Sequence, residues 1–337
     1  MTHTELLLSL LAVVLAAACS ACLTWALRPL LQRYALARPN ARSSHRVPTP
    51  QGAGIAVIAA TLLVTAAIIA GAGSIDAIPF AVFAATLFIA LVGVGDDIRT
   101  IPVLPRLLLQ AMAVAAVVLS VPGDVRIAPA CPLWIERGVV MLAGLWFVNL
   151  VNFMDGLDWM TAAEAVPVSG ALLALGWFGD FPAPATILAA ALFGAMIGFA
   201  PFNRPVARIF LGDVGSLPIG LLLGWCLLQL AWQQQLAAAV LLPLYYLADA
   251  TLTLLRRLIR REPFWAAHRS HFYQRATDNG FTVLRVVSEV FALNIVLAVL
   301  ATASIRAGST AVSMFLLLAG AAAVALVLHR FSHRRPT

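Results

Sequence analysis

The sequence contains no lysine and few charged residues of any kind. Charged side chains make up 11% of the 337 residues, hydrophobic ones make up 62%, and the mean hydropathy is +0.94. Soluble domains carry about 25% charged residues, so this composition excludes an ordinary soluble protein. Low charge and high hydropathy together predict an integral membrane protein.

Cysteine is also scarce, which excludes a disulfide scaffold. The four cysteines are Cys19, Cys22, Cys131 and Cys226, and three of them fall within apolar runs. Cys19 and Cys22 lie one turn apart on an expected helix, and we interpret them as small packing residues rather than a redox or metal pair. The first ten residues contain Glu5 and neither lysine nor arginine, so we expect a permanent helix there instead of a cleaved signal peptide.

Uncharged runs of membrane-spanning length recur along the whole chain. A hydrocarbon core of about 30 Å takes roughly 20 residues as a helix. We predict an all-α polytopic membrane protein in which residues 1–337 form a single domain with eleven spans. The spans are expected near 6–27, 53–73, 77–95, 104–121, 136–153, 160–179, 184–202, 214–232, 236–255, 283–304 and 310–328.

The basic residues, all of them arginine, are distributed unevenly between the two sides of this arrangement. Nineteen of the 22 fall on one side, and the exceptions are Arg126, Arg137 and Arg306. Basic residues concentrate in cytoplasmic loops. This rule predicts an external N-terminus, a cytoplasmic C-terminus and an odd number of spans.

The polar clusters of the sequence fall on that same predicted cytoplasmic side. They contain five aspartates, namely Asp96, Asp97, Asp155, Asp158 and Asp213, together with several arginines. Hard oxygen ligands suit Mg²⁺ or Mn²⁺, and guanidinium groups suit phosphate. Such a combination favours phosphoryl transfer, in which positioning and charge neutralisation supply most of the catalysis.

Each cluster also has a purely structural interpretation. The pair Asp96 and Asp97 could be a solvated helix end, and "FLGDVGSLP" could be a helix entry with Ser216 as N-cap and Pro218 in the first turn. "RRLIRR" could be a membrane anchor, and His271 a surface histidine. The occurrence of all these clusters on one side favours the catalytic interpretation.

Four of these motifs occur in the order found in a known family. "GDDIRTIPVLPRLLLQ", "NLVNFMDGLDWM", "FLGDVGS" and "HRSHFYQR" all lie between residues 39 and 280. The chain resembles the polyprenyl-phosphate N-acetylhexosamine-1-phosphate transferases of glycosyltransferase family 4, which include O-antigen, enterobacterial common antigen and teichoic-acid initiating enzymes and are related to phospho-MurNAc-pentapeptide translocase. The resemblance implies eleven spans and an active site on cytoplasmic loops.

The resemblance also implies roles for individual residues. It implies catalytic roles for Asp96, Asp97, Asp155 and His271, a Mg²⁺ site at Asp213 and Asn152, and substrate contacts from Arg46, Arg106, Asp158, Asn203, Phe210 and Arg269. Mn²⁺ is the alternative metal.

The chain departs from the family pattern in its last motif. Many relatives read Asp-Arg-x-His-x-His-His-Arg there, whereas this sequence has His268 in place of the aspartate and Tyr273 and Gln274 in place of two histidines. This form favours the O-antigen or capsule branch. Asp249, about 10 Å from the inner end of its span, is expected to line the site or pair with an arginine, with helix packing as the alternative.

The implied reaction joins a UDP-N-acetylhexosamine to polyprenyl phosphate and releases UMP, in the bacterial inner (plasma) membrane. UDP-N-acetylglucosamine is the first expectation, followed by UDP-linked 6-deoxy sugars. Either Asp96 or Asp97 would act on the lipid phosphate, by direct attack or through a covalent intermediate. The competing class is a polytopic transporter, but no internal repeat is found. Nothing in the sequence indicates a nucleic-acid partner or an oligomeric state.

Overall fold

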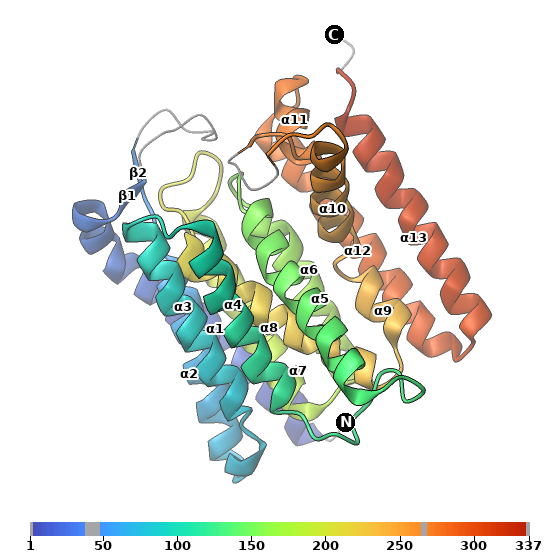
Figure 1. The fold of residues 1–337 in the computed structure, drawn as a ribbon. Helices are drawn as coiled ribbons and strands as arrows, with labels where there is room; N and C mark the ends of the chain where they lie inside the picture. The colour runs from blue at the N-terminus through green and yellow to red at the C-terminus, as the bar shows by residue number, and fades with distance from the viewer. Residues whose placement is uncertain (1–2, 38–47, 264–267, 335–337) are drawn as a thin grey trace.

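The structure, a computed structural model, describes residues 3–37, 48–263 and 268–334. Long helices dominate this part of the chain and lie side by side in one bundle (Figure 1). Two short strands, β1 (Leu36–Ala37) and β2 (Thr49–Pro50), pair antiparallel at one end of the bundle. The prediction of an all-α polytopic protein is confirmed apart from this minimal strand pair.

The helices follow the predicted spans closely. They are α1 (His3–Tyr34), α2 (Gly54–Gly71), α3 (Phe80–Ile98), α4 (Val103–Leu119), α5 (Leu133–Met154), α6 (Met160–Trp177), α7 (Ala183–Phe199), α8 (Asp213–Trp232), α9 (Leu236–Leu241), α10 (Leu244–Ile259), α11 (Phe272–Asp278), α12 (Val283–Ala307) and α13 (Thr310–Phe331), with 3₁₀ turns at Ile75–Ala77 and Ala200–Phe202.

Nine helices in the described residues are long and apolar enough to cross a membrane. They are α1, α2, α3, α5, α6, α7, α8, α12 and α13. Helix α4 is apolar but shorter, with 17 residues, a length of about 25 Å. The chain is therefore a multi-pass membrane protein.

The span predicted as one helix over 236–255 is divided in the structure. Helix α9 ends at Leu241, α10 begins at Leu244, and Pro243 lies at the break. Proline lacks an N–H group and its ring clashes with the carbonyl group four residues earlier, so a continuous helix is disfavoured at this position. The prediction of an unbroken span was wrong here.

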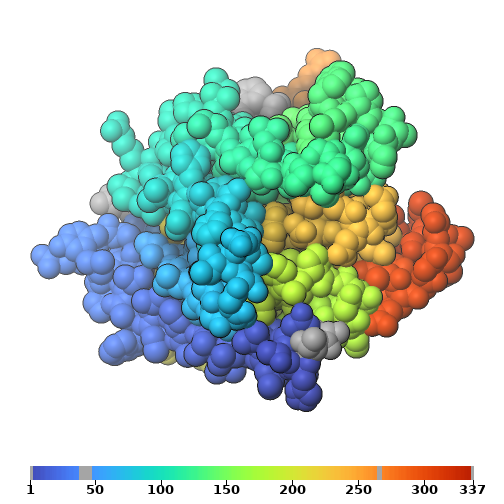
Figure 2. Space-filling model, turned by 90° about the horizontal axis from the view of Figure 1, so that it is seen from below, coloured from blue at the N-terminus to red at the C-terminus, as the bar shows by residue number. Residues whose placement is uncertain are grey.

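Helix α8 forms the centre of the bundle. In its most apolar 18-residue window, 83% of the residues are buried, against 17% for the peripheral α13. Helices α2, α3 and α5 pack directly against α8. Seen from below in Figure 2, yellow-green and gold segments from the middle of the chain lie between the blue N-terminal and red C-terminal segments.

The first and seventh helices approach each other closely. A Cβ atom on Gly194 would lie 2.2 Å from the carbonyl oxygen of Val13, and one on Gly198 would lie 2.2 Å from that of Ala17. Small residues four apart let helix backbones pack in contact within a membrane. This contact fixes α1 against α7.

The polar clusters meet at one end of the bundle. Helices α3 and α5 end there, and α2 and α8 begin there, close to β1, β2 and α11 (Figure 1). Helix α1 begins at the opposite end from the one where α13 finishes.

Candidate functional site

The acidic end of α3 is in direct contact with the start of α8. A Cβ atom on Gly93 would lie 2.5 Å from the backbone carbonyl atoms of Asp213, so only glycine permits this approach. One turn further along α3, Asp96 and Asp97 reach the first residues of α8. The glycine of "GVGDD" therefore determines where the two carboxylates lie.

Asp97 caps the N-terminus of α8 from a different helix. Its Oδ1 accepts the backbone N–H of Asp213 at 3.0 Å, and its Oδ2 accepts that of Val214 at 3.1 Å. The first N–H groups of a helix have no partner within the helix, and α8 has Gly212, without a side chain, at its N-cap position. Both oxygens of Asp97 thus perform the capping that the sequence assigned to Ser216.

Asp96 has different hydrogen-bond partners from those of Asp97. Its Oδ1 accepts the backbone N–H of Ile101 at 2.6 Å, and its Oδ2 accepts a hydrogen bond from Arg106 Nη1 at 2.8 Å. The side chains of Asp96 and Arg106 are 6% and 20% exposed. The carboxyl group of Asp213 lies beside that of Asp96. The structure therefore brings Asp96, Arg106 and Asp213 together.

Asn152 connects the end of α5 to the start of α8. Its Nδ2 donates to Asp213 Oδ1 at 2.8 Å and to Ser216 Oγ at 2.9 Å. Helix α8 begins at Asp213, so Ser216 lies within the helix and Pro218 is its sixth residue. The interpretation of Ser216 as N-cap and of Pro218 as a first-turn residue was wrong.

Asp155 follows the last residue of α5 and faces α6. The hydroxyl group of Thr161 donates to Asp155 Oδ1. Removal from water raises the pKa of Asp155 to about 7, with a smaller contribution from the negative charges of Asp97 and Asp158, and the hydrogen bond from Thr161 limits the rise. Asp155 can therefore take up or release a proton near neutral pH.

Asp158 and Asn203 attach the segment between α7 and α8 to the segment between α5 and α6. Asp158 Oδ2 accepts the backbone N–H of Ala207 at 3.0 Å. Asn203 Oδ1 accepts the N–H of Trp159 at 2.8 Å, and its Nδ2 donates to the carbonyl of Ile209 at 3.0 Å. These two predicted substrate contacts have a structural function in this arrangement.

Phe210 lies beside the start of α2. Its backbone N–H donates to the carbonyl of Pro50 at 2.8 Å, and its carbonyl accepts from Ala53 at 3.1 Å. The Phe210 side chain is partly exposed. The backbone pairing holds this ring at the same end of the bundle as Asp213.

Asp249 and His271 form a buried pair between α10 and α11. Asp249 accepts the backbone N–H groups of Phe272 and Tyr273 at 2.9 and 3.1 Å, and Tyr245 donates its hydroxyl to it at 3.0 Å. His271 Nδ1 lies 3.3 Å from Asp249 Oδ1, and its side chain is 3% exposed. Of the alternatives for Asp249, an ion pair with an arginine is not found among the described residues; the carboxylate caps α11 instead.

Tyr273, at which the last motif departs from the family pattern, packs against the segment that contains Asp155 and Gly156. The hydroxyl of Tyr273 donates to the carbonyl of Phe153 at 3.0 Å, and a Cβ atom on Gly156 would lie 2.2 Å from that hydroxyl oxygen. Tyr273 is completely buried, which raises its pKa well above the usual value. Tyr273 therefore stays neutral and fixes α11 onto the end of α5.

Arg269, another predicted phosphate contact, bonds to residues of α11. Arg269 donates to the hydroxyl of Thr277 at 3.0 Å and lies 3.4 Å from Asp278. Arg46 lies outside the described residues. Among the described residues, Arg106 is thus the predicted phosphate contact that lies against Asp96.

Three residues of this site were missed in the sequence. Thr161 contacts Asp155, Ser216 accepts from Asn152, and Gln51 Nε2 donates to the backbone carbonyl of Asp97 at 3.0 Å. Thr161 and Gln51 lie outside the quoted aspartate motifs. The motif "FLGDVGS" contains Ser216 and so gave a signal for that residue.

The carboxylates of this site are suited to Mg²⁺. Asp96 and Asp213 lie side by side, an arrangement that is favourable for two ionised carboxylates only with a proton or cation between them. Within the described residues, no three His, Cys, Asp or Glu side chains form a complete metal cage. Mg²⁺ is usually held by one or two carboxylates, completed by water and substrate phosphate, and the residues present fit that mode.

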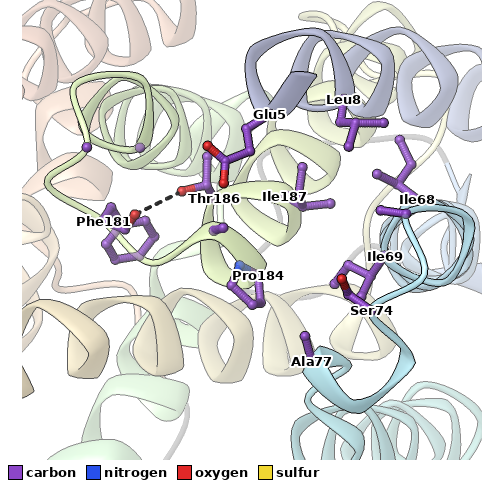
Figure 3. A pocket seen from close by; sticks show the side chains of 14 residues that line it. Glu5, Leu8, Ile68, Ile69, Ser74, Ala77, Phe181, Pro184, Thr186 and Ile187 are labelled. Atoms are coloured by element: carbon purple, nitrogen blue, oxygen red, sulfur yellow. Dashed lines mark hydrogen bonds between the residues drawn. The ribbon is translucent and has the colours of Figure 1, made fainter. Parts of the chain in front are cut away.

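A separate cavity of about 470 Å³ lies at the opposite end of the bundle (Figure 3). It is lined by Ile68 and Ile69 near the end of α2, whereas Gly54, at the start of α2, bonds Leu211 beside the candidate site. The lining is mainly apolar, with Glu5 facing Thr186. This cavity shares none of the acidic residues described above.

Fold and site together define a multi-pass membrane protein with an acidic, arginine-containing site at one end of its helical bundle. Residues 79–231 match the model of glycosyl transferase family 4, which confirms the resemblance found in the motifs. This matched segment carries Asp96, Asn152 and Asp213.

Two relatives align with most of the chain. One is the "Probable undecaprenyl-phosphate N-acetylglucosaminyl 1-phosphate transferase" of Bacillus subtilis, 23% identical over 80% of this chain and 79% of the relative. Another is the decaprenyl-phosphate N-acetylglucosaminephosphotransferase of Mycobacterium leprae, 26% identical over 76% of this chain and 73% of the relative.

A third similarity is more local. The phospho-N-acetylmuramoyl-pentapeptide-transferase of Oceanobacillus iheyensis is 34% identical to this chain over 87 residues. The alignment spans 26% of this chain and 27% of the relative. The match to this class of enzyme is therefore confined to about a quarter of each protein.

Proposed function

We propose that this protein transfers an N-acetylhexosamine-1-phosphate from a UDP-sugar to polyprenyl phosphate, giving polyprenyl-diphospho-sugar and UMP. The observation that carries the proposal is the contact of Asp213 with Asp96 and Asn152, beside Arg106. Relatives aligned over most of the chain are named as polyprenyl-phosphate N-acetylglucosamine phosphotransferases. Carboxylates and a guanidinium group placed together are suited to a diphosphate and its cation.

The reaction exchanges one phosphoanhydride bond for another. An oxygen of the lipid phosphate attacks the sugar-bearing phosphorus atom, the new P–O bond forms, and the bond to UMP breaks. The bond formed and the bond broken are of similar energy, so no external energy source is required.

The chain's own residues position the reacting groups. Arg106, oriented by Asp96, binds phosphate oxygens, and Asn152 orients the Asp213 carboxylate. Asp155, with its pKa of about 7, holds or accepts a proton of the lipid phosphate. Asp213 and Asp96 would hold Mg²⁺, which supplies charge neutralisation on the diphosphate.

The location of the site suits an acceptor embedded in the bilayer. The acids lie where α3 and α5 end and α8 begins, at the level where a lipid phosphate lies while its tail stays in the membrane. We assign this end to the cytoplasm, where UDP-sugars are found, because arginines concentrate there. The N-terminus is then external, and the enzyme belongs to the bacterial inner membrane.

The same proposal extends to the pathway. The "HRSHFYQR" form of the last motif favours the initiating step of an O-antigen or capsule-type glycan, with UDP-N-acetylglucosamine as the first candidate donor. A transporter is the alternative class. Transporters place their polar sites near the bilayer midplane on broken helices, whereas the acids here meet at helix ends.

The proposal is tested by measuring UMP release from a panel of UDP-sugars with polyprenyl phosphate and Mg²⁺. We expect release by the purified protein, loss of release in Asp213→Asn, and loss on chelation with recovery when Mg²⁺ is restored. Asp76→Asn is the matched control, because Asp76 is an exposed acid on the connection between α2 and α3. Absence of release with every sugar, or full activity of Asp213→Asn, would contradict the proposal.

A further inference from the structure

Helix α6 contains a proline whose effect is compensated by α12. Pro167 has no N–H group, so the carbonyl oxygen of Ala163, four residues earlier, lacks its usual helical partner. Asn294 of α12 supplies the missing donor, because its Nδ2 lies 2.8 Å from the Ala163 oxygen. A side chain of one helix thus completes the backbone hydrogen bonding of another.

The same amide group also binds a buried glutamate. Asn294 Nδ2 donates to Glu164 Oε2 at 2.7 Å, and both residues are 1% exposed. In the described part of the chain, Glu164 Oε1 and Asn294 Oδ1 are both buried without a hydrogen-bond partner. Two oxygen atoms on two adjacent side chains therefore both lack a donor.

The orientation of the Asn294 amide is fixed by its surroundings. If its oxygen and nitrogen atoms were exchanged, the oxygen would face the Ala163 carbonyl and the Glu164 carboxyl group, and the two bonds would be replaced by repulsion. Its Oδ1 must therefore accept a proton from elsewhere. The neighbouring group that can carry one is the carboxyl of Glu164.

An ionised Glu164 would be poorly compensated. Among the described residues no arginine or histidine forms an ion pair with it, and its one hydrogen bond comes from a neutral amide. A buried carboxylate without a counter-charge is strongly disfavoured, and a neutral acid is favoured instead. In the acid form, Oε1–H can donate to Asn294 Oδ1.

We infer that Glu164 is a neutral carboxylic acid joined to Asn294 by two reciprocal hydrogen bonds, and that this pair is a positioning device for the catalytic end of α6. In this state both side chains and the Ala163 carbonyl have all their partners. The pair locks α12 onto the first turn of α6, and neither residue contacts substrate.

The connection to the site runs through that first turn. Thr161, three residues before Glu164, donates to Asp155, and Tyr246 of α10 donates to the carbonyl of Met160 at 2.9 Å. A shift of this turn would move the Thr161 hydroxyl away from Asp155. This catalytic consequence rests on the proposed function, whereas the protonation state of Glu164 does not.

Glu164→Gln provides the sharpest test. An amide at this position can donate to Asn294 Oδ1 and accept from Asn294 Nδ2, so it reproduces both bonds of the neutral acid. We expect Glu164→Gln to melt with the wild type in detergent, while Glu164→Ala and Asn294→Ala melt lower. Ser169→Ala is the matched control, because Ser169 is buried in the same helix and bonds only its own helix backbone.

Infrared spectroscopy reports the proton directly. The difference spectrum between wild type and Glu164→Gln at neutral pH should contain the C=O stretch of a protonated carboxylic acid, and the difference spectrum with Ser169→Ala should not. If the band is that of a carboxylate, or if Glu164→Gln melts like Glu164→Ala, the inference is overturned. Neither measurement requires activity, so both remain decisive if the proposed function fails or if the alanine variants do not fold.

Activity then tests the positioning function. We expect the acid limb of the pH profile of kcat/KM to be unchanged in Glu164→Gln and displaced in Asn294→Ala. An unchanged limb in an Asn294→Ala protein that still turns over would show that the pair contributes stability only.

Discussion

The carboxylate of Asp97 accepts the backbone N–H of Asp213 at 3.0 Å, so the second acid of α3 caps the helix that begins with the proposed metal ligand. Its neighbour Asp96 contacts Arg106 and the side chain of Asp213 instead. Asp96 and Asp97 are adjacent residues of the same type, yet they have different functions. Asp97 holds the backbone of α8 in place, and Asp96 faces the group that we propose to bind phosphate.

Substitution of Asp97 should affect stability in a graded way. Asp97→Ala removes both acceptors of the α8 N-terminus, and loss of such a cap costs about 1–2 kcal/mol. Asp97→Asn keeps one oxygen acceptor and should cost less. Thermal melting of the purified proteins should rank wild type above Asp97→Asn and Asp97→Ala lowest; equal melting of wild type and Asp97→Ala would exclude the capping function.

Asp96 and Arg106 should behave as one unit in catalysis. Asp96→Asn or Arg106→Ala should each raise the barrier of kcat/KM by about 1–3 kcal/mol, because each leaves a largely buried partner uncompensated. The double variant should lose about as much activity as the more damaging single one. Additive losses in this double-mutant cycle would show that the two side chains act independently.

The glycine pair of "GVGDD" offers a matched comparison. A Cβ atom on Gly93 would meet the Asp213 backbone at 2.5 Å, whereas one on Gly95 would meet only the Cδ1 atom of Ile101, at 3.5 Å. Gly93→Ala should separate α3 from α8, cost about 1–3 kcal/mol of stability and lower UMP release. Gly95→Ala should leave both unchanged; an equal effect of the two substitutions would contradict the observed packing.

The pH dependence should report Asp155. Its pKa is raised to about 7, and the carboxylate must be ionised to accept a proton, so kcat/KM should rise with pH through that region. The hydrogen bond from Thr161 lowers this pKa, so Thr161→Val should move the rising limb to higher pH. A pH–rate profile that is identical in Thr161→Val and wild type would remove Asp155 from the role of base.

Isotope exchange should distinguish direct attack from a covalent intermediate. Both Asp97 oxygens are engaged by α8, and Asp96 is bonded to Ile101 and Arg106, so neither carboxylate is free to form a bond to phosphorus. Labelled UMP should therefore not enter UDP-sugar in the absence of polyprenyl phosphate. Exchange without the lipid would indicate a covalent intermediate.

The helices were largely predictable from the sequence because each span is a long uncharged run. Each predicted span corresponds to a helix or, at 236–255, to the pair α9 and α10. The break at Pro243 was overlooked, although proline is the residue that ends helices. The β1–β2 pair was missed because two-residue strands leave no periodic pattern.

The members of the site were predictable, but their individual functions were not. The motifs gave Asp96, Asn152 and Asp213, which the structure brings into contact. The division between Asp96 and Asp97 depends on where the first N–H groups of α8 lie, and a single sequence does not contain that information. The cap that Asp249 provides for α11 depends in the same way on the fold.

We propose that sugar and phosphate are transferred as one unit. A donor labelled both in the sugar and in the adjacent phosphate tests this directly. UDP-N-acetylglucosamine carrying one label in the sugar and another in the phosphate next to it should be incubated with the protein, polyprenyl phosphate and Mg²⁺, in parallel with the other sugars of the panel. Both labels should enter the lipid fraction in equal amounts, and UMP should be released. Transfer of the sugar label alone, with release of UDP, would contradict the proposal.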